Sequence, residues 1–185
     1  GMSLTAFMEK HGPVTIDESL GIIADIAAAL AAVHQHNICH RDVKPGNIII
    51  DKSGVAKLTD FGLVSLPDST LTMTNLMGSP AYMSPESYKT SDVDHRADLF
   101  SLGIVAYELL VGKLPFNARN LAILAYQMQD PNPTPPRQMR SEIPEVLEAL
   151  ILKLLAKLPE NRYQQASQLL TELREIQNIC RRHNL

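Results

Sequence analysis

Four polar side chains near the start of the chain are spaced so that they could bind a metal ion and act on a phosphoryl group. Asp42, Lys44 and Asn47 fall in one short segment, and Asp60 follows a little further along. Carboxylate and amide oxygens are the hard ligands that Mg²⁺ prefers, and it commonly takes only one or two from a protein. We expect Asn47 and Asp60 to supply them. Asp42 could accept a proton from a substrate hydroxyl, and Lys44 could contact a phosphoryl oxygen.

A helix and a short hairpin are predicted to position these groups. After the acidic pair Asp17 and Glu18, apolar residues recur at helical spacing from residue 20 to residue 33. Two short apolar runs, 47–50 and 55–58, flank a glycine-containing turn and are typical of a hairpin. Asp42 then precedes the first strand, and Asp60 follows the second.

The rest of the chain is predicted to be mainly α-helical. Residues 66–85 show neither helical nor strand periodicity, which indicates a long irregular segment, and loops of this length are usually functional. Helical patterns follow at 95–111, 120–129, 144–157 and 164–178. With 185 residues, of which 45% are hydrophobic, one domain with one core is expected.

Composition excludes several classes of protein. The formal net charge of -3 gives no global positive field, so no nucleic acid partner is expected. Cys39 and Cys180 are the only cysteines, which argues against a disulfide framework and favours a reducing, cytoplasmic location. The most apolar stretch, 22–33, is too short to cross a bilayer, so no membrane segment is expected here, although the whole protein could be anchored through a region outside these residues.

Three motifs resemble those of protein kinases and occur in the order typical of that family. HRDVKPGN at 40–47 is similar to the catalytic loop, DFG at 60–62 to the metal-binding triplet, and GSPAYMSPE at 78–86 to the end of the activation segment. The resemblance extends over nearly the whole chain and implies a Hanks-type Ser/Thr protein kinase, with RYQ at 162–164 closer to bacterial members. Residues 1–185 would form the large C-terminal lobe, with catalytic loop 38–50, activation segment 60–86 and C-terminal helices 94–180.

The resemblance implies a role for each of the four polar side chains. Asp42 would be the catalytic base and Lys44 the contact to the γ-phosphate of ATP. Asp60 would be the main Mg²⁺ ligand and Asn47 a second one, with Mn²⁺ as an alternative ion. Lysine two residues after Asp42 is typical of Ser/Thr kinases, so the protein substrates would carry Ser or Thr.

The resemblance also implies regulatory residues. Arg41 precedes the catalytic aspartate, as in kinases that are activated by phosphorylation of the activation segment, because an arginine there can pair with the added phosphate. Thr70, Thr72 and Thr74 are the candidate sites, against the alternative of a merely solvated loop. Ser79 occupies the position that docks Ser/Thr substrates.

Three further residues resemble structural positions of the family. Glu86 and Arg162 match a buried ion pair between the activation segment and the late helices. Asp98 resembles a helical aspartate that accepts backbone hydrogen bonds from the catalytic loop. The departures are Ser84, where alanine is commoner, and Leu158, where aspartate is usual, and neither removes a catalytic atom.

The small lobe of a kinase has no counterpart in the sequence. Glycines 1, 12 and 21 lack the spacing of a phosphate-covering loop, and Lys10 follows no strand pattern. We therefore expect these residues alone to be inactive, with Ile49 beneath the adenine and Ser3 near the ribose of a poorly held ATP. The face that meets the small lobe (48–50, Leu58 and Phe61) is expected to be exposed and to favour self-association.

Two alternatives remain open at this stage. The chain could be a catalytically silent kinase-like scaffold or binding module, although the intact Asp42, Lys44, Asn47 and Asp60 argue against it. It could also be an unrelated helical domain with chance motifs, which would require the Glu86, Asp98 and Arg162 matches to be coincidental. Gly1 is either the remnant of an expression tag or a native residue following the hinge between lobes.

Overall fold

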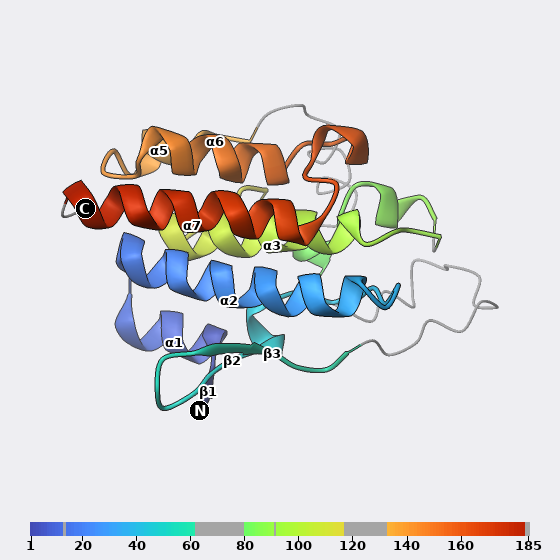
Figure 1. The fold of residues 1–185 in the computed structure, drawn as a ribbon, viewed down its shortest axis with the longest axis horizontal. Helices are drawn as coiled ribbons and strands as arrows, with labels where there is room; N and C mark the ends of the chain where they lie inside the picture. Colours follow the sequence, from blue (N-terminus) through green and yellow to red (C-terminus); the bar gives the residue numbers. More distant parts are fainter. Residues whose placement is uncertain (13, 62–79, 91, 117–132, 184–185) are drawn as a thin grey trace.

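The computed structural model describes residues 1–12, 14–61, 80–90, 92–116 and 133–183. Helices dominate these residues, and α2 (Ile16–His34) packs against both α3 (Arg96–Val111) and α7 (Ala166–His183) (Figure 1). A small sheet and α1 (Leu4–His11) lie beside α2, while α5 (Pro136–Met139) and α6 (Glu145–Leu154) lie at the opposite side (Figure 1). The described residues also include the 3₁₀ turns η1 (Pro45–Asn47), η2 (Pro80–Tyr82), η3 (Glu86–Tyr88) and η4 (Pro159–Asn161).

Helix α2 begins at a capping box. The Thr15 hydroxyl oxygen accepts from the backbone N–H of Glu18 at 3.2 Å, and the Glu18 carboxylate accepts from the backbone N–H of Thr15 at 3.3 Å. This reciprocal pair satisfies two of the donors that a helix start leaves without partners. The helix therefore begins at Ile16, just before the acidic pair that marks its start in the sequence.

The predicted hairpin is present, but it is part of a three-stranded antiparallel sheet. β2 (Ile48–Ile50) lies in the middle, between β3 (Ala56–Leu58) and the unforeseen β1 (Met2–Ser3). β1 leads directly into α1, whose first turn is capped by the Ser3 hydroxyl. The sheet holds the segment that carries Asp42 and Asn47 beside the segment that carries Asp60.

The prediction that the hairpin residues form an exposed apolar face is wrong for most of those residues. Ile48, Ile50 and Leu58 are only 0%, 6% and 7% exposed, because the sheet turns them into the core under α1 and α2. Ile49 points the other way, as alternation along a strand requires, and is half-buried. Phe61 is 48% exposed. The apolar surface in this region is therefore much smaller than a fully exposed hairpin would give.

Helix α3 is the centre of the fold and is buried along almost its whole length. Gly103 permits its close contact with α6: a Cβ at this position would lie 2.7 Å from the Cβ of Leu154. The helix ends at Gly112, whose φ of 75° is the left-handed conformation that glycine adopts without strain.

The late helices α6 and α7 match the predicted 144–157 and 164–178 within a few residues. The predicted helix 120–129 and most of the predicted loop 66–85 lie outside the described residues. Across the five ranges given above, no helix is long and apolar enough to cross a membrane.

Candidate active site

Asp42, Lys44 and Asn47 converge on one carboxylate. The Lys44 Nζ lies 2.7 Å from Asp42 Oδ2, and the Asn47 side-chain amide donates to the same oxygen at 2.8 Å and to the Asp42 backbone carbonyl at 2.9 Å. Asn47 is 8% exposed at the end of η1, whereas the Asp42 side chain remains 38% exposed. The arrangement holds an accessible carboxylate in a fixed orientation beside a cation.

Asp60 is tied to this cluster through the backbone of its neighbour. Thr59 donates to the Asn47 carbonyl from its backbone N–H at 2.9 Å and from its hydroxyl at 3.1 Å. Asp60 itself has a φ of +56°, a conformation that a residue with a side chain adopts at a cost of about 1 kcal/mol or more. The chain thus turns sharply at Asp60, immediately beyond its anchor to Asn47.

The His40 ring joins the two segments. Its Nδ1 accepts from the backbone N–H of Asp42 at 3.3 Å, so the proton of the neutral ring belongs on Nε2, which donates to the Thr59 carbonyl at 2.9 Å. The ring also meets Phe61 edge-on, with 5.0 Å between centroids. His40 therefore fixes the catalytic-loop-like segment against the end of β3.

A buried carboxylate on α3 anchors the backbone just before Asp42. Asp98, 1% exposed, accepts from the backbone N–H groups of His40 at 2.8 Å and Arg41 at 2.7 Å, and its Oδ2 lies 2.9 Å from the Nε2 of His34. The two loop bonds are those expected of Asp98. Charge-assisted bonds of this kind are the strong class of hydrogen bond. These bonds hold Arg41 at a φ of +66°, a strained backbone conformation. Part of the free energy that the bonds contribute therefore offsets that strain.

The oxygen donors present fit a hard divalent cation. With its nitrogen engaged by Asp42, the Asn47 amide has its carbonyl oxygen left to offer, and Asp60 adds a carboxylate. Among the residues that the structure describes, no group of three or more His, Cys, Asp or Glu side chains could hold a metal. Mg²⁺ suits such a site, because it usually takes few protein ligands and completes its shell with water and phosphate oxygens.

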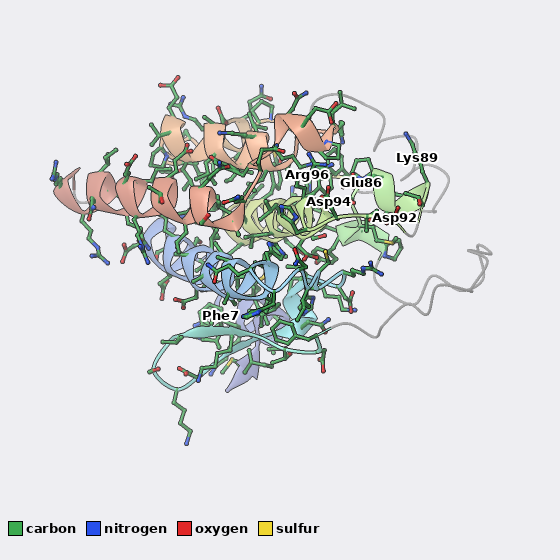
Figure 2. The ribbon with its side chains drawn as sticks, turned by 45° about the vertical axis from the view of Figure 1, so that its right-hand side comes forward. Phe7, Glu86, Lys89, Asp92, Asp94 and Arg96 are labelled. Atoms are coloured by element: carbon green, nitrogen blue, oxygen red, sulfur yellow. The ribbon has the colours of Figure 1, made fainter. Side chains whose placement is uncertain are left out.

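Arg162 lies near the same N-terminal end of α3 as Asp98, and all of its donors have partners. Its Nη1 and Nη2 donate to the two oxygens of Glu86 at 2.7 and 2.8 Å, and the three remaining N–H groups donate to backbone carbonyls of residues 96, 156 and 157. Burial acts to raise the pKa of Glu86, but the hydrogen bonds and charge of Arg162 outweigh it, and the pKa lies below its usual value. Figure 2 shows Glu86 beside Asp94 and Arg96. Hydrogen bonds from Arg96 lower the pKa of Asp94.

Comparison with known protein families identifies the family of the chain. The protein kinase domain family matches residues 1–173. The chain belongs to the protein kinase domain family. Kinases of this family use ATP with a divalent metal ion and act on proteins.

The relatives found include bacterial Ser/Thr kinases. The chain is 40% identical over 177 residues to the serine/threonine-protein kinase PknB of Mycolicibacterium smegmatis, covering 94% of this chain and 28% of PknB. It is 39% identical to a probable serine/threonine-protein kinase of Clostridium perfringens, covering 95% and 26%. A crystal structure of Rad53 in complex with AMP-PNP is similar with a TM-score of 0.79 and 30% identity, covering 93% of this chain and 43% of that one. The chain therefore spans about a quarter of the length of these curated relatives.

Two further contacts that the sequence did not reveal join the segment at residue 82 to α3. The Tyr82 hydroxyl donates to Glu108 on α3 at 2.6 Å, and the Ser101 hydroxyl donates to the Tyr82 carbonyl at 2.7 Å. Burial raises the pKa of Glu108 and of Tyr82. The sequence could not predict that Glu108 is partly buried, because the residues of α3 are buried on every side and their spacing does not mark an inner face.

The other expected site residues are placed as follows. Ser3 accepts from the backbone N–H of Ala6 at 3.2 Å as the cap of α1, and Ile49 lies half-buried on β2. Thr70, Thr72, Thr74 and Ser79 lie outside the described residues.

Proposed function

We propose that this chain is the large lobe of a Ser/Thr protein kinase that transfers the γ-phosphoryl group of ATP to hydroxyls of protein substrates in a signalling pathway. The observation that carries the proposal is the cluster of Asp42, Lys44 and Asn47 around one accessible carboxylate, anchored from α3 by Asp98. A fold alone needs no accessible carboxylate there, whereas phosphoryl transfer depends on positioned charge.

In this proposal Asp42 orients the substrate hydroxyl and accepts its proton. Lys44, already within 2.7 Å of that carboxylate, contacts the γ-phosphate. Asn47 and Asp60 hold Mg²⁺, or Mn²⁺ in its place, and the ion when bound neutralises charge on the phosphate oxygens. Asn47 would contribute to both tasks, because the nitrogen of its amide fixes Asp42 and its oxygen would be left to hold the ion.

We further propose that ATP binds over β2, with Ile49 beneath the adenine and Ser3 near the ribose. Ile49 and Ser3 would not cover the phosphates of ATP, so activity would require a small lobe with a glycine-rich loop and a strand lysine. Phe61 would then lie at the contact between the lobes. Its 48% exposure, rather than a wider apolar face, leaves only a small surface for self-association at this point.

Regulation of the proposed kinase would act through the activation segment. Arg41 would pair with a phosphate on Thr70, Thr72 or Thr74, and Ser79 would help to dock the substrate. We place the catalytic lobe in the cytoplasm.

A phosphorylation assay tests the function. The chain is joined to a protein kinase small lobe, and transfer from ATP to a generic Ser/Thr substrate is followed with Mg²⁺ or Mn²⁺, beside the chain alone. We expect transfer only from the joined protein, and its loss in Asp42→Asn and Asp60→Asn variants, with Asp92→Asn as an exposed control. A joined protein that binds ATP and metal yet transfers nothing, even with a phosphorylated activation segment, would favour the silent scaffold.

A further inference from the structure

A groove between α6 and α7 lies outside the proposed active site. It has a volume of about 540 Å³ and is lined on one side by Val146 of α6 and on the other by one long face of α7. Apolar Val146 and Ile179 are 44% and 40% exposed at its two walls, and the acidic groups are Glu172 and Glu175. The groove thus combines apolar surface with negative charge.

Helix α7 has a buried inner face and a more exposed outer face. Its inner face, formed by Leu169, Leu173, Ile176 and Cys180, is at most 3% exposed, and the helix packs on α2. Its outer face carries a second stripe with alternating spacings of four and three residues, which keeps its members on one side of the helix. That stripe consists of Gln168, Glu172, Glu175, Ile179 and Arg182.

Arg182 gives this stripe a positive end. It is exposed one heptad after Glu175, on the same side of the helix. Neither residue forms an ion pair within the described part of the chain. Glu172 is held by the Tyr163 hydroxyl at 2.8 Å, which leaves Glu175 as the acidic group available for pairing.

We propose that the groove is the interface between two copies of this chain, with their α7 helices antiparallel. An antiparallel pairing centred beside Ile179 sets Glu175 of each copy opposite Arg182 of the other, so one two-fold axis creates both ion pairs. A parallel pairing would set like charges against each other. The exposed Ile179 and Val146 supply the apolar centre between the two charge pairs. The chain itself therefore carries both the acidic groove and the basic group that complements it.

Sedimentation equilibrium of the chain tests this interface. Because a small interface of this kind is weak, the measurement covers about 10 to 1000 μM. We expect a monomer–dimer equilibrium that weakens with added salt. Glu175→Arg and Arg182→Glu should each raise the dimer Kd about tenfold, since symmetry removes two pairs at once, and the double exchange should restore it to within about threefold of the original.

Arg174→Glu is the matched control, because it makes the same charge change on α7 about 120° away from the stripe. It should leave the Kd within about twofold, and thermal melts should show that all variants are folded. A chain that stays monomeric over the whole range would overturn the proposal and leave the groove to a basic segment of another protein. The proposal would also be overturned if the dimer Kd stays unchanged in Glu175→Arg and in Arg182→Glu while Phe61→Ser abolishes the dimer.

Discussion

Replacing Arg162 by methionine should destabilise the fold more than any surface change of equal size. The guanidinium uses all five N–H groups, two on Glu86 and three on backbone carbonyls. Methionine fills much of the space but donates nothing. The Glu86 carboxylate would then remain partly buried without its cation, and three carbonyl oxygens would lose a donor.

The expected cost follows from this geometry. Removing one member of a buried ion pair costs about 3 to 5 kcal/mol. The Glu86 side chain keeps 20% of its surface exposed, so water can reach the remaining carboxylate. We therefore expect the lower end, about 3 kcal/mol in the free energy of unfolding.

The cost should also depend on pH. Since Arg162 lowers the pKa of Glu86 below its usual 4.5, the pair stabilises the fold fully above that pH, and the stabilisation is lost as pH falls through the folded pKa. In the variant, burial acts unopposed and raises the pKa of Glu86. The difference between the two proteins should therefore be largest at neutral pH. It should shrink as pH falls from the raised pKa of Glu86 in the variant, above 4.5, to the lowered pKa of Glu86 in the original pair.

Urea unfolding followed by circular dichroism at pH 7 and pH 4 measures both effects. Arg137→Met is the matched control, because its partner Glu145 is 86% exposed at 3.8 Å, and it should cost less than about 0.5 kcal/mol. A loss below about 1 kcal/mol for Arg162→Met, or a loss equal at both pH values, would refute the assignment of a stabilising buried pair.

Three further changes test the contacts that position the site. Asp98→Asn should cost about 2 kcal/mol and speed hydrogen exchange at the two loop amides it holds, as measured by NMR; unchanged exchange would contradict the anchoring role. Gly103→Ala should cost about 1 to 3 kcal/mol in urea unfolding, because its Cβ would meet Leu154 at 2.7 Å, whereas Gly21→Ala, with nothing within 4 Å, should not destabilise. Thr15→Ala should lower the thermal stability by about 1 kcal/mol through loss of the capping box, and no change would argue against the cap.

Local pattern was enough to predict much of the fold. The helix after residue 15, the hairpin and the two late helices each have regular apolar spacing, and the structure has all of them. Strand β1 is only two residues long and depends on pairing with β2, so no local signal marks it. The burial of Ile48, Ile50 and Leu58 likewise depends on α1 and α2 packing over the sheet, which a strand pattern alone does not contain.

The site shows the same division between local and distant information. Motif order was enough to select Asp42, Lys44, Asn47 and Asp60, and three of these are in direct contact. The sequence could not give the proton position on the His40 ring, because that follows from bonds to two backbone groups whose placement only the folded chain defines. The roles of all four side chains in transfer stay predictions until activity is measured.

The Glu86–Arg162 pair has a consequence for synthesis of the chain on the ribosome. The partners are 76 residues apart, so at about 5 to 20 residues per second Glu86 waits about 4 to 15 s for its cation to be made. Helix α2 waits longer still for α7, the last helix, which covers one of its faces. The faces of α2 that α3 and α7 cover therefore stay exposed until those helices are made, although β3 can already pack on α2. We expect chaperones to bind the nascent chain during that interval.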